Sequence, residues 1–378
     1  MVDASVTQAR VRDEIVRLVH RGLPVPDFAR AVGEALGRAV PAEGSCLMTT
    51  DPATMLPTAE FAEQGLPAAE LLRLVEMDVR EPDFNTWVQL ARGGRPAGSL
   101  SEATAGDLER SLRQREIRRP HGFSDELRVV LAGSTGTWGK LTVFRAGKSP
   151  YFSSAEVEFV SSLAPLITDG LRRSLLLGDA QAGADDVGLL VLDADDGVRM
   201  SNKAADRLLD ELGTGARAGT RLPLVISAVA DQTRYLCGLA TSAAPASTDA
   251  RPTDAQPARA RARTRTGQWL TVRGSLLSDG PDPQIAVMLE VARPAEMAPL
   301  MVDAYGFTDS ERRVTELVAK GMSTKQIAGQ LHLSSYTVQD HLKSIFAKSG
   351  TGSRGDLIAR LFLDHYAAPL TSGVAAHL

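Results

Sequence analysis

Cysteine is scarce in this 378-residue chain: only Cys46 and Cys237 occur, and neither belongs to a CxxC motif or a Cys/His cluster. That scarcity argues against a disulfide framework and against a structural zinc site, so no metal is predicted. The chain also lacks a run of about 18 uninterrupted apolar residues, and no transmembrane helix is expected. The N-terminal stretch has no apolar segment behind a basic start. We therefore expect no signal peptide and a cytoplasmic location.

A strong charge excess is also absent. The net charge is -4, which excludes a polycation that binds nucleic acid through its overall charge. Any DNA binding must come from a local surface. The hydrophobic fraction of 43% is ample for more than one core, and the length predicts two or three domains of roughly 100–200 residues each.

Motifs for catalysis are missing as well. The segment GSTGTWGK at Gly133–Lys140 looks like a P-loop, but five residues separate Gly133 from Gly139 where the motif has four. Leu141 stands where a magnesium-binding Ser or Thr is needed, so the segment is interpreted as a hairpin loop. We find no nucleophile–base pair, and we predict no enzyme, no catalytic residue and no cofactor.

Residues 1–178 combine helical and alternating patterns, which predicts an α+β domain. Helices are expected at 5–20, 26–39 and 154–177, and strands at 45–49, 58–62, 127–131 and 140–145. Ser153 and Glu156 form a capping box that opens the last helix. Its apolar residues recur at heptad-like spacing: Val157, Val160, Ala164, Ile167 and Leu171. This layout resembles GAF sensor domains.

Residues 185–292 predict a second α+β domain. Strands are expected at 187–193, 198–201, 268–277 and 285–291, and helices at 203–212 and 223–240. The opening GLLVLDADDGVRMSNKAADRLL resembles the first hairpin and helix of a PAS domain, and an α+β domain of undefined type is the alternative. The domain contains no histidine, so the usual axial ligand of a heme is missing.

Two segments of this region predict flexible connections. Residues 241–265 are low in complexity and carry almost nothing apolar beyond alanine, which predicts a flexible loop inside the PAS-like domain. Within it, arginines alternate at 259, 261, 263 and 265, a pattern typical of the edge of a strand, with a DNA-contacting arm as the alternative. Residues 293–299 carry two prolines and predict a linker.

Residues 300–366 predict an all-α domain of four helices, followed by a tail at 367–378. Capping boxes open the first two helices at Thr308 and Ser323, and Gly321 ends the first of them. Ser334 caps the third helix and Gly350 ends it, and Ser353 opens the fourth. A short helix, a tight turn and a longer helix form a helix-turn-helix, whose second helix enters the major groove.

The outward face of that second helix follows from its periodicity. If Val338, Leu342 and Ile345 face the core, then Tyr336, Gln339, Asp340, Lys343 and Ala347 face outward. Gln pairs with adenine, Asp accepts from cytosine and Lys donates to guanine. Basic side chains and a helix N-terminus are placed to meet phosphates. The predicted DNA-binding set is Lys325, Ser334, Ser335, Tyr336, Thr337, Gln339, Asp340, Lys343, Lys348 and Arg354.

The same segment closely resembles the LuxR-type helix-turn-helix family. The matching positions are Thr308, Glu311, Val314, Leu317, Ala319, Gly321, Ser323, Lys325, Ile327, Ala328, Leu331, Ser334, Thr337, Val338, His341, Leu342, Ile345, Lys348, Gly350, Ser353, Arg354 and Leu357. The resemblance places base reading at Gln339, Asp340 and Lys343. The sequence departs from the family at Gln339, where a basic residue is usual, and Asp340 adds a negative charge.

The resemblance implies a DNA-binding transcription regulator whose N-terminal domains sense a signal. It also implies a homodimer, formed through helix 154–177 and the fourth helix of the C-terminal domain. Double-stranded DNA is the expected partner, and RNA polymerase and a small-molecule effector are further candidates. Two alternatives stay open: a helix-turn-helix that contacts only proteins, and a sigma-factor-like protein. Residues 303–364 carry eight Lys and Arg against seven Asp and Glu, so weak binding per monomer favours a dimer.

Overall fold

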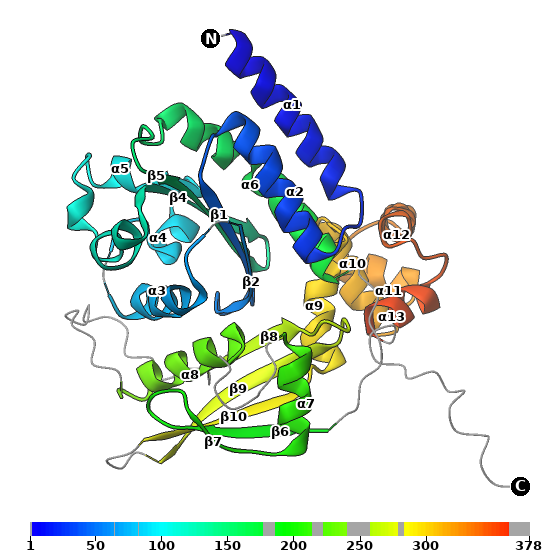
Figure 1. Cartoon of the computed structure of the whole chain (residues 1–378). Helices are drawn as coiled ribbons and strands as arrows, with labels where there is room; N and C mark the ends of the chain where they lie inside the picture. Colours follow the sequence, from blue (N-terminus) through cyan, green and yellow to red (C-terminus); the bar gives the residue numbers. More distant parts are fainter. Residues whose placement is uncertain are drawn as a thin grey trace, which may run out of the picture. The chain divides into compact units, whose positions relative to one another are not determined.

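The computed structural model describes residues 2–63, 65–81, 83–176, 186–213, 222–239, 258–278 and 283–362. The chain forms two compact units, residues 1–175 with 185–291 and residues 176–184 with 292–378 (Figure 1). The predicted C-terminal tail and residues 241–257 of the predicted flexible loop lie outside the described residues. Among the described helices, none combines the length and apolarity that a membrane span requires.

The first unit begins with a five-stranded antiparallel sheet in the order β2-β1-β5-β4-β3. Its strands are β1 (Gly44–Thr50), β2 (Pro57–Glu63), β3 (Ala97–Ser99), β4 (Phe123–Gly133) and β5 (Gly136–Ala146). The helices are α1 (Val2–Val19), α2 (Val25–Ala39), α3 (Ala68–Arg80), α4 (Trp87–Arg92), α5 (Leu100–Ala103) and α6 (Ser154–Leu176), with short turns η1 (Leu108–Arg110), η2 (Gln114–Arg118) and η3 (Arg119–His121). These elements confirm the expected α+β pattern.

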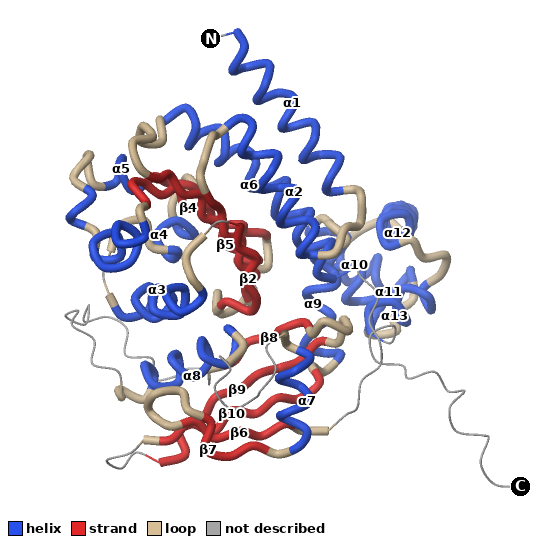
Figure 2. The backbone as a smooth tube through the Cα atoms, viewed as in Figure 1, coloured by secondary structure: helices blue, strands red, loops and turns tan. Residues whose placement is uncertain are grey.

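Helices cover both faces of this sheet (Figure 2). On one face α6 packs so closely on β5 that a Cβ at Gly139 would lie 2.6 Å from Leu171. On the other face α3 and α4 enclose a cluster with Cys46, Met48, Leu74, Trp87, Val130 and Phe144. The heptad-like residues of α6, from Val157 to Leu171, are all buried inside this domain. That apolar stripe therefore packs on the protomer's own sheet, and dimerisation through helix 154–177 stays a prediction.

The glycine-rich segment joins β4 to β5 as a tight hairpin, as the sequence predicts, and no helix follows it. Gly136 has φ 129°, a conformation that side chains rarely allow. A Cβ at this position would also lie 1.9 Å from the carbonyl oxygen of Pro52. The glycine therefore serves the turn and a close backbone contact rather than a phosphate.

The second sheet of this unit has the order β7-β6-β10-β9-β8 and is also antiparallel. It consists of β6 (Gly188–Leu192), β7 (Val198–Ser201), β8 (Arg259–Arg263), β9 (Trp269–Ser278) and β10 (Gln284–Val291), with α7 (Lys203–Glu211) and α8 (Leu224–Leu236) between its second and third strands. Residues 259–263 lie inside the segment predicted as a flexible loop, but they form β8 at the edge of the sheet, as the alternating arginines indicated. Alternating burial of Ala260 and Ala262 holds this edge strand on the core.

The two sheets of the first unit are joined by contacts of the β1–β2 loop. Asp51 is 2% exposed and accepts hydrogen bonds from the backbone N, the Nε and the Nη2 of Arg261 at 2.8, 2.7 and 3.2 Å. Leu56 of the same loop belongs to the apolar core of the second sheet. Helix α8 packs on β9 and β10 and also on α3 and β2.

The second unit is helical, with α9 (Pro294–Ala304), α10 (Asp309–Ala319), α11 (Thr324–Leu331), α12 (Ser335–Ser349) and α13 (Arg354–Phe362). The predicted linker 293–299 is wrong, since α9 begins at Pro294. Proline is favourable at the first helical position, where its missing N–H would have no partner. Helix α9 packs against α13, and its buried residues Met297, Leu300 and Met301 extend the helical core.

Candidate nucleic-acid interface

Helices α11 and α12 are set by their caps. Ser323 and Gln326 exchange hydrogen bonds at the start of α11, and the Ser334 hydroxyl accepts from the Thr337 N–H at 3.0 Å at the start of α12. Between the helices His332 takes φ 54°, and the Leu333 N–H donates to the Ala328 carbonyl at 2.9 Å. The turn is therefore tight and its backbone bonds are satisfied, as the helix-turn-helix pattern predicts.

The faces of α12 follow the predicted periodicity. Val338, Leu342 and Ile345 are buried, and the residues predicted to face outward are all exposed: Tyr336, Gln339, Asp340, Lys343 and Ala347. Tyr336 is 71% exposed. The side chain of Lys343 is 79% exposed and its Nζ lies 3.9 Å from Asp340, a pairing too solvated to hold it. The central residues of this face are therefore available to a partner.

Glu311 accepts several hydrogen bonds that tie α10 to α12, a role the sequence did not reveal beyond its capping box. Lys348 Nζ and the Ser344 hydroxyl each donate to its carboxylate at 2.6 Å, and the Thr308 N–H donates at 2.7 Å. Burial alone would raise the pKa of Glu311, but the bonds from Lys348, Ser344 and Thr308 outweigh it and lower the pKa to about 2. Lys348, predicted to meet phosphate, therefore has an internal partner.

Arg354 also has internal partners. Its Nη1 donates to the Met322 carbonyl at 2.6 Å and its Nη2 to the Thr324 hydroxyl at 2.9 Å. These bonds fix α13 to the start of α11 and satisfy a carbonyl just before that helix. A basic residue of the motif thus supports the helix-turn-helix from inside, which sequence spacing does not reveal.

The remaining predicted residues lie near the two helix starts. Lys325 is exposed on the first turn of α11, and Ser334, Ser335 and Tyr336 are exposed at the start of α12. Thr337 is half-buried and its hydroxyl lies 2.9 Å from that of Ser334. The first N–H groups of α12 have no partner within the helix and carry the positive end of its dipole. An anion at this point would be stabilised.

Asp303 and His341 are two further polar residues of the helical unit. Asp303 is fully buried and pairs with Arg312 at 2.6 Å, so this acid does not add to the charge of the surface. Across the part of the chain that the structure describes, no group of three or more His, Cys, Asp or Glu is placed to hold a metal. His341 is half-buried beside Leu342 on α12.

Residues 306–361 match the family described as bacterial regulatory proteins, luxR family. The transcriptional regulatory protein DesR of Bacillus subtilis is 34% identical over 96 residues, which are 24% of this chain and 48% of DesR. The chain thus spans about half the length of this relative.

Two solved structures resemble the chain more distantly. SdiA of Escherichia coli is 12% identical over 92% of this chain and 94% of its own, with a TM-score of 0.32. The GAF domain of a Coxiella burnetii phosphoenolpyruvate-protein phosphotransferase is 16% identical over 44% of this chain and 93% of its own, with a TM-score of 0.30. The likenesses are too distant to carry over a ligand or a residue role. The family match and the geometry of α10 to α13 establish that the chain carries a C-terminal helix-turn-helix domain of the luxR family.

Proposed function

We propose that this chain is a transcription regulator that binds double-stranded DNA in a sequence-specific manner through α12. The observation that carries the proposal is the exposed polar face of α12 with Gln339, Asp340 and Lys343 at its centre, on a helix held by caps and a buried core. In a helix-turn-helix this second helix lies in the major groove with its N-terminal residues toward the bases.

The three side chains supply complementary recognition chemistry. The Gln339 amide matches the N6 and N7 edge of adenine, the Asp340 carboxylate accepts from cytosine N4, and Lys343 donates to guanine O6 or N7. The Lys343–Asp340 pair is solvated and separated by 3.9 Å, so base contacts need not break a strong internal bond.

Phosphate contacts are proposed at Lys325 and at the N-terminus of α12. Both are exposed, and the free N–H groups of Ser335 and Tyr336 favour an anion. For Lys348 and Arg354 the internal bonds support a structural role rather than a phosphate contact. With few free cations, one domain would bind weakly, which supports two copies on a two-fold site. RNA polymerase would be contacted from the bound site, and such a regulator would act in the cytoplasm of a bacterium.

The first unit is proposed to sense the signal. Its second sheet repeats the strand order of its first sheet, with α7 and α8 inserted between the second and third strands. This repetition supports GAF-like and PAS-like sensor domains over 1–178 and 185–292. A small-molecule effector is the proposed input, and non-enzymatic signalling is the proposed mode of action.

The proposal is tested by selecting binding sites from a random DNA pool with the full-length protein. The matched control is the variant Gln339→Ala/Asp340→Ala/Lys343→Ala, whose exposed substitutions leave the core intact. Enrichment of a short two-fold motif by the unaltered protein alone supports the proposal. No enrichment, with and without effector candidates, contradicts it and favours a helix-turn-helix that contacts proteins.

Single substitutions then separate the roles. Lys343→Ala is expected to weaken binding to the best site by about 1–3 kcal/mol and to relax the preference at one base pair. Arg354→Ala is expected to lower the melting temperature of the helical unit, because the Met322 carbonyl loses its donor. Equal loss on all sequences for Lys343→Ala would contradict base reading, and a stable Arg354→Ala protein with a reduced salt dependence would restore its phosphate role.

A further inference from the structure

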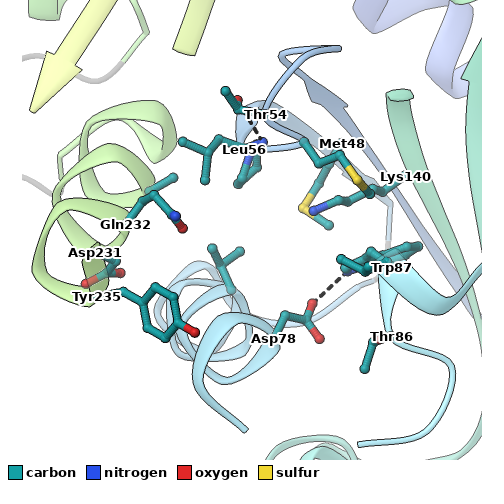
Figure 3. Close-up of a pocket in the computed structure, with 15 residues that line it drawn as sticks. Met48, Thr54, Leu56, Asp78, Thr86, Trp87, Lys140, Asp231, Gln232 and Tyr235 are labelled. Atoms are coloured by element: carbon teal, nitrogen blue, oxygen red, sulfur yellow. Dashed lines mark hydrogen bonds between the residues drawn. The ribbon is translucent and has the colours of Figure 1, made fainter. Parts of the chain in front are cut away.

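The first unit contains a cavity of about 280 Å³ between the face of the first sheet and helices α3, α4 and α8 (Figure 3). This volume is near the lower end of the ~300–1,000 Å³ typical of small-molecule sites. Most of its wall is apolar: Met48, Met55, Leu56, Val75, Trp87 and Ala228. The cavity thus suits the apolar body of a small molecule rather than a hydrated ion.

One polar group in the wall stands out, the amine of Lys140. Lys140 lies on β5 between Met48 of β1 and Val130 of β4, and all three side chains face α3 and α4. It is only 8% exposed, and Figure 3 shows its nitrogen directed into the cavity. Its Nζ lies 5.4 Å from the centre of the Trp87 ring. Among the described residues the amine has no hydrogen bond and no carboxylate within ion-pair distance.

The charged side chains around Lys140 already form ion pairs with one another. Asp78 binds Arg128 at 2.9 Å and accepts from Trp87 Nε1 at 2.7 Å. Across the cavity on α8, Asp231 pairs with Arg234 at 3.0 Å. Behind the wall, Glu126 and Asp83 bind two further buried arginines, Arg113 and Arg118.

These ion pairs join four arginines to four carboxylates, and among the described residues they leave the Lys140 amine at the cavity surface without a hydrogen bond or ion pair of its own. The pKa of Lys140 is lowered to about 8, because burial disfavours the charged amine more than the nearby Asp78 favours it. An amine buried without a partner is costly, and an anion in the cavity would remove that cost.

We infer that this cavity binds a small monocarboxylate with an apolar body, whose carboxylate pairs with Lys140. The Trp87 ring and the Met48 and Val75 side chains would pack against the body. Gln232 and Tyr235 of α8 lie on the opposite wall and offer an amide and a hydroxyl to a polar group at its far end (Figure 3). The inference deepens the proposed function, since such a ligand would be the effector.

The cavity is placed to link the two sheets. Met55 and Leu56 line it, and they belong to the same loop as Asp51, which binds Arg261 of β8. Leu56 also packs in the core of the second sheet. Ala228, Asp231, Gln232 and Tyr235 line it from α8, which packs on β9 and β10. A ligand would therefore contact both halves of the first unit at once.

The test uses the full-length protein without DNA, so that it succeeds or fails independently of DNA binding. Octanoate and 3-phenylpropanoate are titrated by calorimetry at neutral pH, beside the uncharged octanamide and 3-phenylpropanamide. We expect each carboxylate to bind about tenfold more tightly than its amide, because a charge-assisted bond to Lys140 is lost in the amide. No detectable binding of either carboxylate, or equal binding of acid and amide, overturns the inference.

Lys140→Met and Lys140→Gln identify the residue that recognises the anion. Both are expected to abolish the preference for carboxylate over amide while the protein stays folded, since each removes an unpartnered buried amine. Lys148→Met is the matched control, because Lys148 is exposed in the turn after β5. A preference that persists in both Lys140 variants, or that disappears equally in the Lys148 variant, contradicts the assignment.

Discussion

The two sheets of the first unit share one strand order but have very different interiors. The first encloses Arg113, Arg118 and Arg128, each at most 1% exposed, around the buried Glu126. The second is filled by Leu, Val, Ile and Ala, and its described buried polar residues are uncharged: Ser227, Thr233, Thr264, Gln268 and Thr271. The same topology thus holds two kinds of core.

The comparison shows that strand order does not require a particular interior. Strand order follows from where strands and turns occur and from which face is apolar, whereas a buried ionic cluster must offset a large desolvation cost with accurate geometry. The first domain retains such a cluster beside its cavity, and the second has none among its described residues. The cavity itself is lined from both domains, by β1, β5, α3 and α4 of the first and by α8 of the second.

The largest effect is expected from Glu126→Gln. The substitution keeps the shape of the side chain but leaves three buried guanidinium groups without their central carboxylate, which should cost about 3–5 kcal/mol of unfolding free energy. Hydrogen exchange followed by mass spectrometry would report the loss in β4 and β5. Glu109→Gln, an exposed acid of the same domain, is the control. A change of less than about 1 kcal/mol would show that the cluster does not hold this domain.

In the second domain a comparable loss must come from packing. Leu270→Ala removes a fully buried side chain from β9 and should cost about 3 kcal/mol through lost burial and a cavity. The loss should be independent of pH, unlike that of Glu126→Gln. Urea unfolding of the two variants beside the unaltered protein at pH 7 and pH 3 distinguishes the two origins, and an equal pH dependence of the two losses would remove the contrast between the cores.

Most of the strands and the long helices of both domains could be predicted from the sequence, but the elements between β2 and β4, the cluster and the cavity could not. Helix 154–177 and the four strands after residue 186 came from local periodicity and turn residues, and they lie within a few residues of α6 and of β6, β7, β9 and β10. Arginine is almost never fully buried without a partner. The partners of Arg128 and Arg113 include Asp78 and Asp83 from other elements. Such contacts depend on tertiary structure, which no local pattern encodes.

The same limit applies to the helical unit. The outward face of α12 followed from periodicity, because one helix determines it. The internal bonds of Lys348 to Glu311 and of Arg354 to Met322 join separate helices, so the sequence, which predicts a phosphate contact for both residues, does not reveal them. Two prolines suggested a linker at 293–299, although Pro294 occupies the position where proline starts a helix well.

Low pH is expected to destabilise the charged core of the first domain but not the apolar core of the second. Burial would raise the pKa of Glu126, but Arg113, Arg118 and Arg128 outweigh it and lower the pKa to about 2. Its stabilisation is therefore complete above the unfolded pKa near 4.5 and is lost as pH falls toward 2. Between pH 5 and 3 the first domain should lose about 2 kcal/mol from this group. Hydrogen exchange across this range should show β4 and β5 opening before β9 and β10, and the reverse order would contradict the contrast.

The smallest effect concerns the bond between the two domains. Arg261→Lys retains the backbone N–H bond to Asp51 but loses the paired guanidinium bonds, which should cost about 1 kcal/mol. Arg265→Lys on the exposed end of the same segment is the matched control. Asp51 and Leu56 share one loop that joins the two domains. In calorimetry we therefore expect the unaltered protein to melt in one transition and Arg261→Lys to melt in two separate transitions. A single shifted transition in Arg261→Lys would show that the apolar contact of Leu56, rather than the ion pair, couples the charged core to the apolar one.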